Sequence, residues 1–327
     1  MNKPYTSTFR GTLAVLLGTI LCWTTGLTAG DNLGSIAIGV MGDSNSDEYR
    51  ADDNRGGAFS EVTLNWVEIM QRTRDVDFGP WGNRREPRRT GYAYNWARSG
   101  ARAADLDPQA RGLARQVRAG DVDYVLIHIG TNDFHPNSSY GDVYHGRVSG
   151  TELEQKILQI TSDIRSAISL VRREGANVVV TGVPDPGLYP EFQQIYPDAQ
   201  QRQSVSNAID RINDSLAADA EHDPRITYVD MDVIADEIMA RADDGSSYIL
   251  VGNQRISRTA RSNDPSHLQL DDNAGHGGTV VNGLLANTLF ITPLNESFGL
   301  DIPQLSDEEI LCIAGLKEES ACATSPE

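Results

Sequence analysis

Short, mainly apolar segments alternate with longer stretches of helical periodicity along most of the chain. The clearest apolar segments are nearly continuous in valine, isoleucine and leucine, as is typical of strands covered on both faces. Turn-forming residues follow them, which limits each one to the length of a single strand. Five segments are predicted to be strands, namely 36–42, 94–98, 123–129, 177–182 and 225–230.

Helices are predicted between these strands. Ser60 is predicted to cap the first one, whose apolar positions run to Met70. The strongest pattern lies at 151–173, and further helices are expected at the segments 200–221 and 280–291. Strands that alternate with helices pair in parallel through right-handed crossovers, so the pattern predicts an α/β fold. Residues 248–256, with Gly252-Asn253 in the middle, are predicted to form a small hairpin.

Three of the predicted strands end in residues that suit an active site. The first runs into Gly42-Asp43-Ser44, the second into Ser99-Gly100 and the third into Gly130-Thr131-Asn132-Asp133. Open α/β sheets bind ligands at the carboxyl ends of their strands, so Ser44 is a candidate nucleophile there. The Gly100 N–H and the Asn132 amide are candidate donors to an oxyanion. The alternative for each is ordinary turn chemistry, and His128, inside the third strand, is expected to be a core histidine.

Charge limits the classes of partner. The formal net charge is -18 and the isoelectric point is near 4.7, while 39% of the 327 residues are hydrophobic. A surface this acidic repels phosphates, which argues against nucleic acid and anionic membranes as partners. Residues 83–89 are a local basic cluster, suited either to an acidic substrate group or to pairing with neighbouring carboxylates. The acidic residues 47–57 are expected to cover the site as a solvated loop, with calcium binding as the weaker alternative.

The N-terminus resembles an export signal, because Lys3 and Arg10 precede a short apolar run and then small residues up to Ala29. Cleavage after Ala29 is expected, with a lipid anchor at Cys22 or an uncleaved anchor as alternatives. Export would leave Cys312 and Cys322 as the mature cysteines, and these are predicted to form one disulfide. The predicted organisation is therefore a signal at 1–29, a main α/β domain at 30–294 and a tail at 295–327 that contains a short helix.

The order of the three strand-end motifs resembles the SGNH or GDSL hydrolase family of esterases and lipases, from Ile36 to about Ile291. The resemblance implies a flavodoxin-like three-layer α/β/α sandwich with a central parallel sheet of about five strands. It implies that Ser44 is the nucleophile, and that the Ser44 N–H, the Gly100 N–H and the Asn132 side chain form the oxyanion hole. Asn45 departs from the family, which usually has leucine there.

The family's Asp-x-x-His motif has two candidates in this chain. Asp264 and His267 have the literal spacing, but His276 lies directly ahead of an apolar helix that Thr279 is expected to cap. We favour His276 as the base with Asp272, four residues earlier, as its acid. Asp264 and His267 remain the alternative pair.

These residues predict a secreted or periplasmic serine hydrolase that cleaves acyl or acetyl esters, including esters on carbohydrate, through an acyl-serine intermediate. No metal or organic cofactor and no stable membrane insertion of the mature chain are expected. The sequence does not indicate the oligomeric state. Four aromatic residues are candidate sugar-stacking surfaces, namely Trp81, Tyr92, Tyr94 and Trp96. The alternative function is an exported, non-catalytic ligand- or carbohydrate-binding module on the same fold.

Overall fold

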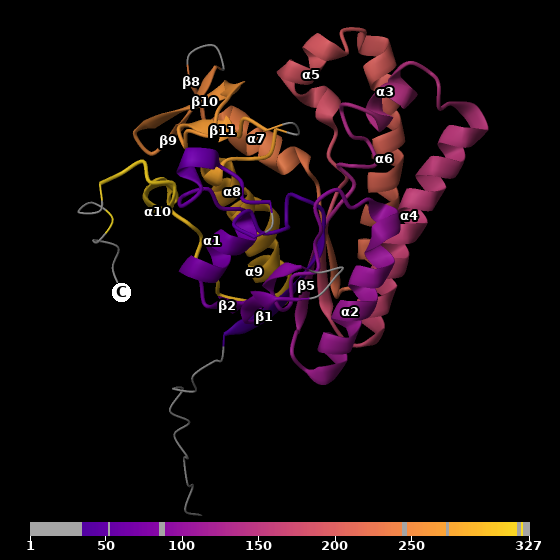
Figure 1. Cartoon of the computed structure of the whole chain (residues 1–327). Helices are drawn as coiled ribbons and strands as arrows, with labels where there is room; N and C mark the ends of the chain where they lie inside the picture. The colour runs from indigo at the N-terminus through magenta and orange to yellow at the C-terminus, as the bar shows by residue number, and fades with distance from the viewer. Residues whose placement is uncertain are drawn as a thin grey trace, which may run out of the picture. The chain divides into compact units, whose positions relative to one another are not determined.

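A five-stranded parallel sheet lies at the centre of the structure, which is a computed structural model (Figure 1). The structure describes residues 35–51, 53–84, 89–243, 247–272, 275–318 and 322. The strands are, in spatial order, β2 (Val76–Asp77), β1 (Ile36–Gly42), β5 (Tyr124–His128), β6 (Asn177–Thr181) and β7 (Ile226–Val229). This flavodoxin-like order puts the topological switch point between β1 and β5, where open sheets place their ligands. The predicted fold class is confirmed.

Helices cover both faces of this sheet, which is why its three central strands are almost wholly buried. One face is covered by α2 (Leu106–Ala119), α4 (Gly150–Arg173) and α6 (Ala199–His222). The other is covered by α1 (Trp66–Thr73), α8 (Thr279–Leu285), η4 (Ala286–Ile291) and α9 (Thr292–Phe298). In α4, the isoleucines that predicted the helix, at 157, 160, 164 and 168, are buried against the sheet.

A second, smaller sheet follows α7 (Asp232–Ala240) and lies beside α8 (Figure 1). It contains β8 (Ala242–Asp243), β9 (Tyr248–Val251), β10 (Gln254–Arg261) and β11 (His267–Gln269). Strands β9 and β10 form the predicted hairpin, with Gly252 in the left-handed conformation at its turn. This sheet carries the chain to the loop that precedes α8.

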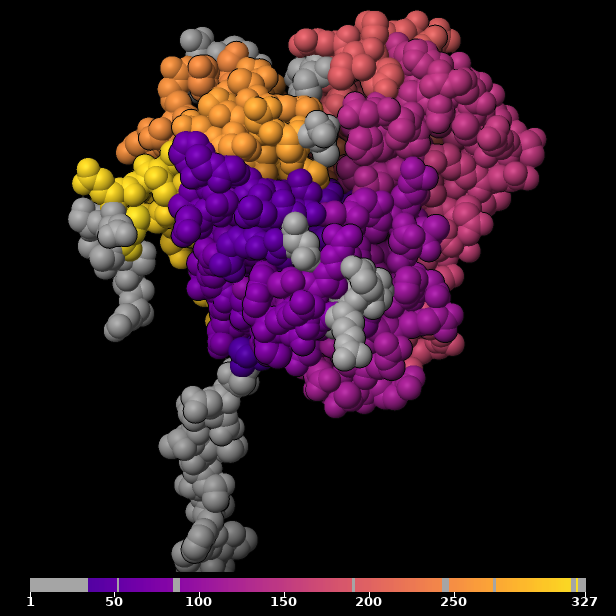
Figure 2. All heavy atoms as spheres, viewed as in Figure 1, coloured from indigo at the N-terminus to yellow at the C-terminus, as the bar shows by residue number. Residues whose placement is uncertain are grey.

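The remaining short elements lie in the connections. They are η1 (Gly57–Phe59), β3 (Trp81–Asn83), β4 (Thr90–Tyr92), η2 (Ala103–Asp105), α3 (Ser139–Tyr144), η3 (Pro186–Leu188), α5 (Pro190–Ile195) and α10 (Asp307–Ile313). Figure 2 shows the molecule in space-filling form from the same side as Figure 1. In this view the orange segment of the second sheet and the magenta segment of α3 and α4 lie on opposite sides.

The structure corrects the second predicted strand. Residues 94–98 make only one bridge to the sheet, between Val40 and Asn95. The segment still runs along the end of β1, because Trp96 N donates to Val40 O at 2.9 Å and Arg98 N donates to Gly42 O at 3.0 Å. Within it, the Asn95 side chain accepts a hydrogen bond from Ala97 N at 3.0 Å and closes a local turn in place of a regular strand. The two-residue strand β2 takes the outer place instead. The first helical element after Gly100 is η2, which begins at Ala103.

Two predicted helix starts are also wrong. Helix α1 is capped by Asn65 rather than Ser60, because Asn65 and Glu68 form a reciprocal capping box. Thr279 is the first residue of α8 rather than its cap. Its hydroxyl donates to Val62 O at 2.5 Å and accepts from Leu64 N at 3.0 Å, so it joins α8 to the segment before α1.

The tail carries a short helix, α10, as predicted. Ser306 and Glu309 form its capping box, and Ile310 and Leu311 are buried. Cys312 is bonded to Cys322. The predicted signal at 1–29 lies outside the described residues. Within the described part of the chain, none of the helices has the length and apolar character needed to cross a bilayer.

Candidate active site

Ser44 lies just beyond the carboxyl end of β1 and is 9% exposed. The strand end is held by Gln109 of α2, whose side chain accepts from Gly42 N at 2.9 Å and donates to Gly42 O at 3.0 Å. Glycine is required at position 42, because a Cβ there would collide with the His128 carbonyl oxygen of β5. The sheet therefore fixes the backbone that presents Ser44.

Asn45 stabilises the turn that follows. Its backbone N–H and its side-chain amide donate to Asp43 Oδ1 at 3.0 and 2.9 Å. Its amide also lies 3.3 Å from Thr131 Oγ1. A polar residue at this position thus links the turn after β1 to the turn after β5, a link that leucine cannot make.

His276 is the histidine that reaches Ser44. Its Nε2 lies 2.7 Å from Ser44 Oγ, and its Nδ1 lies 2.6 Å from Asp272 Oδ2. The other Asp272 oxygen accepts from Gly275 N at 2.6 Å and His276 N at 3.1 Å. Gly275 has a φ of +66°, which lets this loop fold back so that Asp272 meets the ring despite the four-residue spacing.

The proton positions in this group follow from charge. Burial opposes ionisation of Asp272, but hydrogen bonds from His276 and the nearby Arg55 charge outweigh it and hold the carboxyl pKa well below its usual value. The ionised carboxylate accepts a hydrogen bond from Nδ1–H, which leaves the Nε2 lone pair facing the Ser44 hydroxyl. This is the tautomer that a histidine needs to act as a general base.

Two backbone N–H groups near Ser44 have no acceptor among the described residues, namely those of Ser44 and Gly100. Gly100 has a φ of +83°, and the space around its Cβ position is empty. The Asn132 amide donates to Ala101 O at 2.9 Å, which fixes its side chain beside the Gly100 turn. These are the three donors predicted for the oxyanion hole.

The alternative pair lies apart from the serine. Asp264 Oδ1 accepts from Ser266 N at 2.8 Å, which closes a local turn. His267 begins β11, and its Nδ1 lies 3.3 Å from Ser266 Oγ. Neither residue makes a hydrogen bond to Ser44 within the described part of the chain. His128 also stays in the core, where its Nδ1 lies 2.7 Å from Thr181 Oγ1.

The loop at 47–57 supplies residues that the sequence did not identify. Arg55 Nη1 lies 2.8 Å from Asp272 Oδ2, and the Tyr49 ring packs edge-on against His276. Glu68 of α1 holds the loop by accepting from Tyr49 N at 3.1 Å and Arg50 N at 3.2 Å. The Asn65–Glu68 capping-box spacing could have revealed the role of Glu68, but no local pattern marks Arg55.

Two further carboxylates of this loop are buried. Burial raises the pKa of Glu48 to about 8, against the lowering effect of a 2.7 Å hydrogen bond from Tyr92 N. Burial likewise raises the pKa of Asp47 to about 6, with Arg98 and the Ser99 N–H as the opposing influences. The loop is therefore partly built into the core and is not the solvated face that its composition suggested.

The aromatic side chains that the sequence suggested as a sugar-stacking surface are less exposed than expected. Trp81 is 42% exposed, but Tyr92 is buried behind it, with the two rings edge-on at 4.9 Å. Trp96 is held in the structure by its indole N–H, which donates to Gln116 at 2.8 Å. Residues 85–88 of the basic cluster lie outside the described residues.

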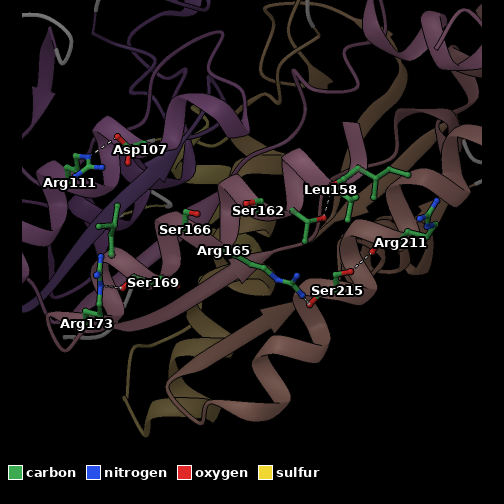
Figure 3. A pocket seen from close by; sticks show the side chains of 13 residues that line it. Asp107, Arg111, Leu158, Ser162, Arg165, Ser166, Ser169, Arg173, Arg211 and Ser215 are labelled. Carbon is green, nitrogen blue, oxygen red and sulfur yellow. Dashed lines mark hydrogen bonds and ion pairs between the residues drawn. The ribbon is translucent and has the colours of Figure 1, made fainter. Parts of the chain in front are cut away.

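A separate hollow of about 860 Å³ lies on the outer surface of the helices (Figure 3). It is lined by residues of α2, α4 and α6 and contains none of the candidate catalytic residues. Three of its arginines are already paired with carboxylates, Arg111 with Asp107, Arg165 with Asp219 and Arg211 with Glu154. Within the described residues, no three acidic, histidine or cysteine side chains gather in a way that could hold a metal ion.

Comparison with known proteins places the chain in a family. The family model described as GDSL-like Lipase/Acylhydrolase matches residues 38–273. A comparison with curated proteins gives no match.

Similar solved structures include an extracellular lipase from Streptomyces rimosus (17% identity, TM-score 0.40, 80% of this chain and 99% of that one). Phospholipase A1 from Streptomyces albidoflavus is also similar (16% identity, TM-score 0.40, 80% of this chain and 99% of that one). A third is an acetyl xylan esterase from Geobacillus stearothermophilus (14% identity, TM-score 0.39, 83% of this chain and 98% of that one). On the match of the family model, the chain belongs to the GDSL-like lipase/acylhydrolase family of enzymes that act on ester bonds.

Proposed function

We propose that the protein is an exported serine hydrolase that cleaves small carboxylic esters through an acyl-serine intermediate. The observation that carries the proposal is the line of contacts from Ser44 Oγ through His276 to Asp272, with distances of 2.7 and 2.6 Å. A serine hydroxyl is a weak nucleophile near neutral pH, and an imidazole held by a carboxylate makes it reactive.

In the acylation step, His276 Nε2 takes the hydroxyl proton as Ser44 Oγ attacks the ester carbonyl carbon. The carbonyl oxygen becomes an oxyanion, which the N–H groups of Ser44 and Gly100 and the amide of Asn132 stabilise. His276 then gives the proton to the leaving alcohol as the ester C–O bond breaks. Asp272 stabilises the imidazolium that forms between these two transfers.

In the deacylation step, water replaces the alcohol. His276 takes a proton from the water as its oxygen attacks the acyl-serine, and the same donors stabilise the second oxyanion. The proton returns to Ser44 Oγ as the carboxylic acid leaves. These steps use only side chains and backbone groups of the chain, with no metal or organic cofactor.

The proposed substrates are small acyl esters, with acetyl esters of carbohydrate as a class to be tested. Trp81 supports the carbohydrate class, because its exposed indole ring offers a flat surface for a sugar. Export is proposed from the N-terminal pattern, and the bonded cysteines of the tail support an oxidising compartment. N-terminal sequencing and intact mass of the exported protein test cleavage after Ala29 and the absence of free thiols.

The function is tested with Ser44→Ala. We expect the variant to fold normally but to lose at least about a thousandfold in hydrolysis of a short-chain aryl ester and all labelling by a fluorophosphonate probe. Ser215→Ala is the matched control, since Ser215 lies in α6 on the outer hollow, and it should keep both activities. Labelling that persists in Ser44→Ala would show that another residue is the nucleophile.

The binding-module alternative depended on the imperfect spacing of the acid in the sequence. The 2.6 Å contact between Asp272 and His276 removes that ground and supports turnover. Absence of ester hydrolysis across several acyl lengths and pH values by the purified chain would restore the alternative.

A further inference from the structure

Arg55 binds directly to the acid of the proposed triad. Its Nη1 lies 2.8 Å from Asp272 Oδ2 and 2.8 Å from His276 Nδ1, and its Nη2 lies 2.9 Å from Asp53 Oδ2. The guanidinium also stacks over the Tyr49 ring, 5.3 Å from its centroid. The Arg55 side chain is only 13% exposed, so it is fixed within the protein.

Two donors share one carboxylate oxygen in this arrangement. Because Asp272 is ionised, Nδ1 of His276 carries a proton that points at Oδ2, and the Arg55 N–H points at the same oxygen. Nδ1 then has no lone pair to accept from Arg55, so the guanidinium and the ring meet as neighbours and not as a hydrogen-bonded pair. A cation thus lies against the side of the imidazole that becomes positive during catalysis.

The same arginine connects the triad to the oxyanion side of the site. Asp53, which binds the other end of the guanidinium, accepts a hydrogen bond from the Ser99 hydroxyl. Ser99 N donates to Asp47 at 2.8 Å and directly precedes Gly100. A continuous chain of contacts, Asp272–Arg55–Asp53–Ser99, therefore runs from the acid to the turn that presents the Gly100 N–H.

We infer that Arg55 is a positioning residue that holds Asp272 in place and fixes a positive charge beside the His276 ring. The inference rests on the proposed function of Ser44 and His276. A guanidinium beside the ring disfavours imidazolium, so its removal should make the ring easier to protonate. Among the described residues, the charged and titratable groups next to the ring are Arg55, Asp272 and Tyr49. Asp53 acts on the ring indirectly by pairing with Arg55, and His135 lies at longer range.

The test measures the protonation midpoint of the His276 ring by NMR in the full chain, together with the pH profile of kcat/KM on a short-chain aryl ester. In Arg55→Met we expect both midpoints to rise by about one pH unit, because the opposing cation is lost. Arg118→Met is the matched control: Arg118 pairs with Glu174 on the exposed surface, and its loss should move neither midpoint.

Asp53→Asn should change the protonation midpoint of the ring in the opposite direction. This variant provides the test if Arg55→Met does not fold. Loss of the carboxylate that offsets the guanidinium should lower the ring midpoint. Arg55→Lys keeps the charge and hence the midpoint, but an ammonium cannot span Asp272 and Asp53, so kcat should fall about tenfold at unchanged KM.

The inference would be overturned if the His276 ring had the same protonation midpoint in the parent, in Arg55→Met and in Asp53→Asn, whatever happens to the rate. A parent protein without ester turnover would instead contradict the proposed function. The NMR midpoints decide the role of Arg55 in that case too, because they require no substrate.

Discussion

At the scale of single residues, the site depends on side chains that each have one defined task. Ser44 is presented by a glycine that no other residue can replace, and His276 receives its orientation from Asp272. Asp272 in turn is shared by the ring, two backbone N–H groups and Arg55. Each contact is short and partly buried, so the loss of one changes the orientation of the next.

The two histidine candidates can be separated by substitution. We expect His276→Ala to lose nearly as much esterase activity as Ser44→Ala, because members of a triad act as a unit. His267→Ala should keep most activity, since His267 lies in β11 and bonds locally. Asp272→Asn should fall between them, because the amide keeps the shape but cannot stabilise imidazolium. Steady-state kinetics of the three variants check this, and an inactive His267→Ala beside an active His276→Ala would transfer the roles.

At the scale of elements, the site depends on how α1 and α8 begin. Both helix starts lie beside the loops that carry the proposed catalytic groups, and Asn282 of α8 accepts from Trp66 N of α1 at 3.1 Å. Asn65 caps α1 and donates to Asp47 O at 2.8 Å, which anchors the 47–57 loop. The sequence indicated both helices. The start of α1 is set by its local capping box, whereas Thr279 at the start of α8 is bound to the distant segment before α1.

Asn65→Ala tests this anchoring. We expect the free energy of unfolding to fall by about 1–3 kcal/mol, because a helix cap and a buried hydrogen bond are lost together. Asn207→Ala, at an exposed position within α6, is the matched control and should have a near-neutral or slightly stabilising effect. Urea denaturation measures both, and equal effects of the two substitutions would contradict a capping role for Asn65.

At the scale of the whole molecule, charge and buried acids set the dependence of stability on pH. The chain carries a formal net charge of -18, and Glu48, only 3% exposed, lies in the same region as Asp47 and Glu68. A carboxyl whose folded pKa is raised keeps its proton in the folded state at pH values where the unfolded chain has already lost it. The free energy of unfolding therefore falls as pH rises from the unfolded pKa toward about 8.

Glu48→Gln should remove this contribution, because glutamine is neutral at every pH and can still accept from Tyr92 N. Relative to the parent, we expect the variant to gain about 2–4 kcal/mol in the free energy of unfolding between pH 5 and pH 8. Urea denaturation at the two pH values provides the measurement. Glu154→Gln, on an exposed ion pair with Arg211, is the control and should track the parent. A stability difference that is the same at both pH values would show that Glu48 is ionised throughout.

The sequence by itself determined the parts that depend on local pattern. The alternation of apolar strands with periodic helices fixed the parallel α/β fold, and the turns after the strands marked Ser44, Gly100 and Asn132, because parallel strands end at one edge of a sheet. The choice of His276 over His267, the short strand β2 at the outer edge of the sheet and the place of Arg55 were decided only by the tertiary structure. The reason is physical: Ser44 and His276 are 232 residues apart and Arg55 and Asp272 are 217 apart. Neither contact leaves a periodic or local signal in the chain, so only the packing of the loops around the sheet edge brings these residues together.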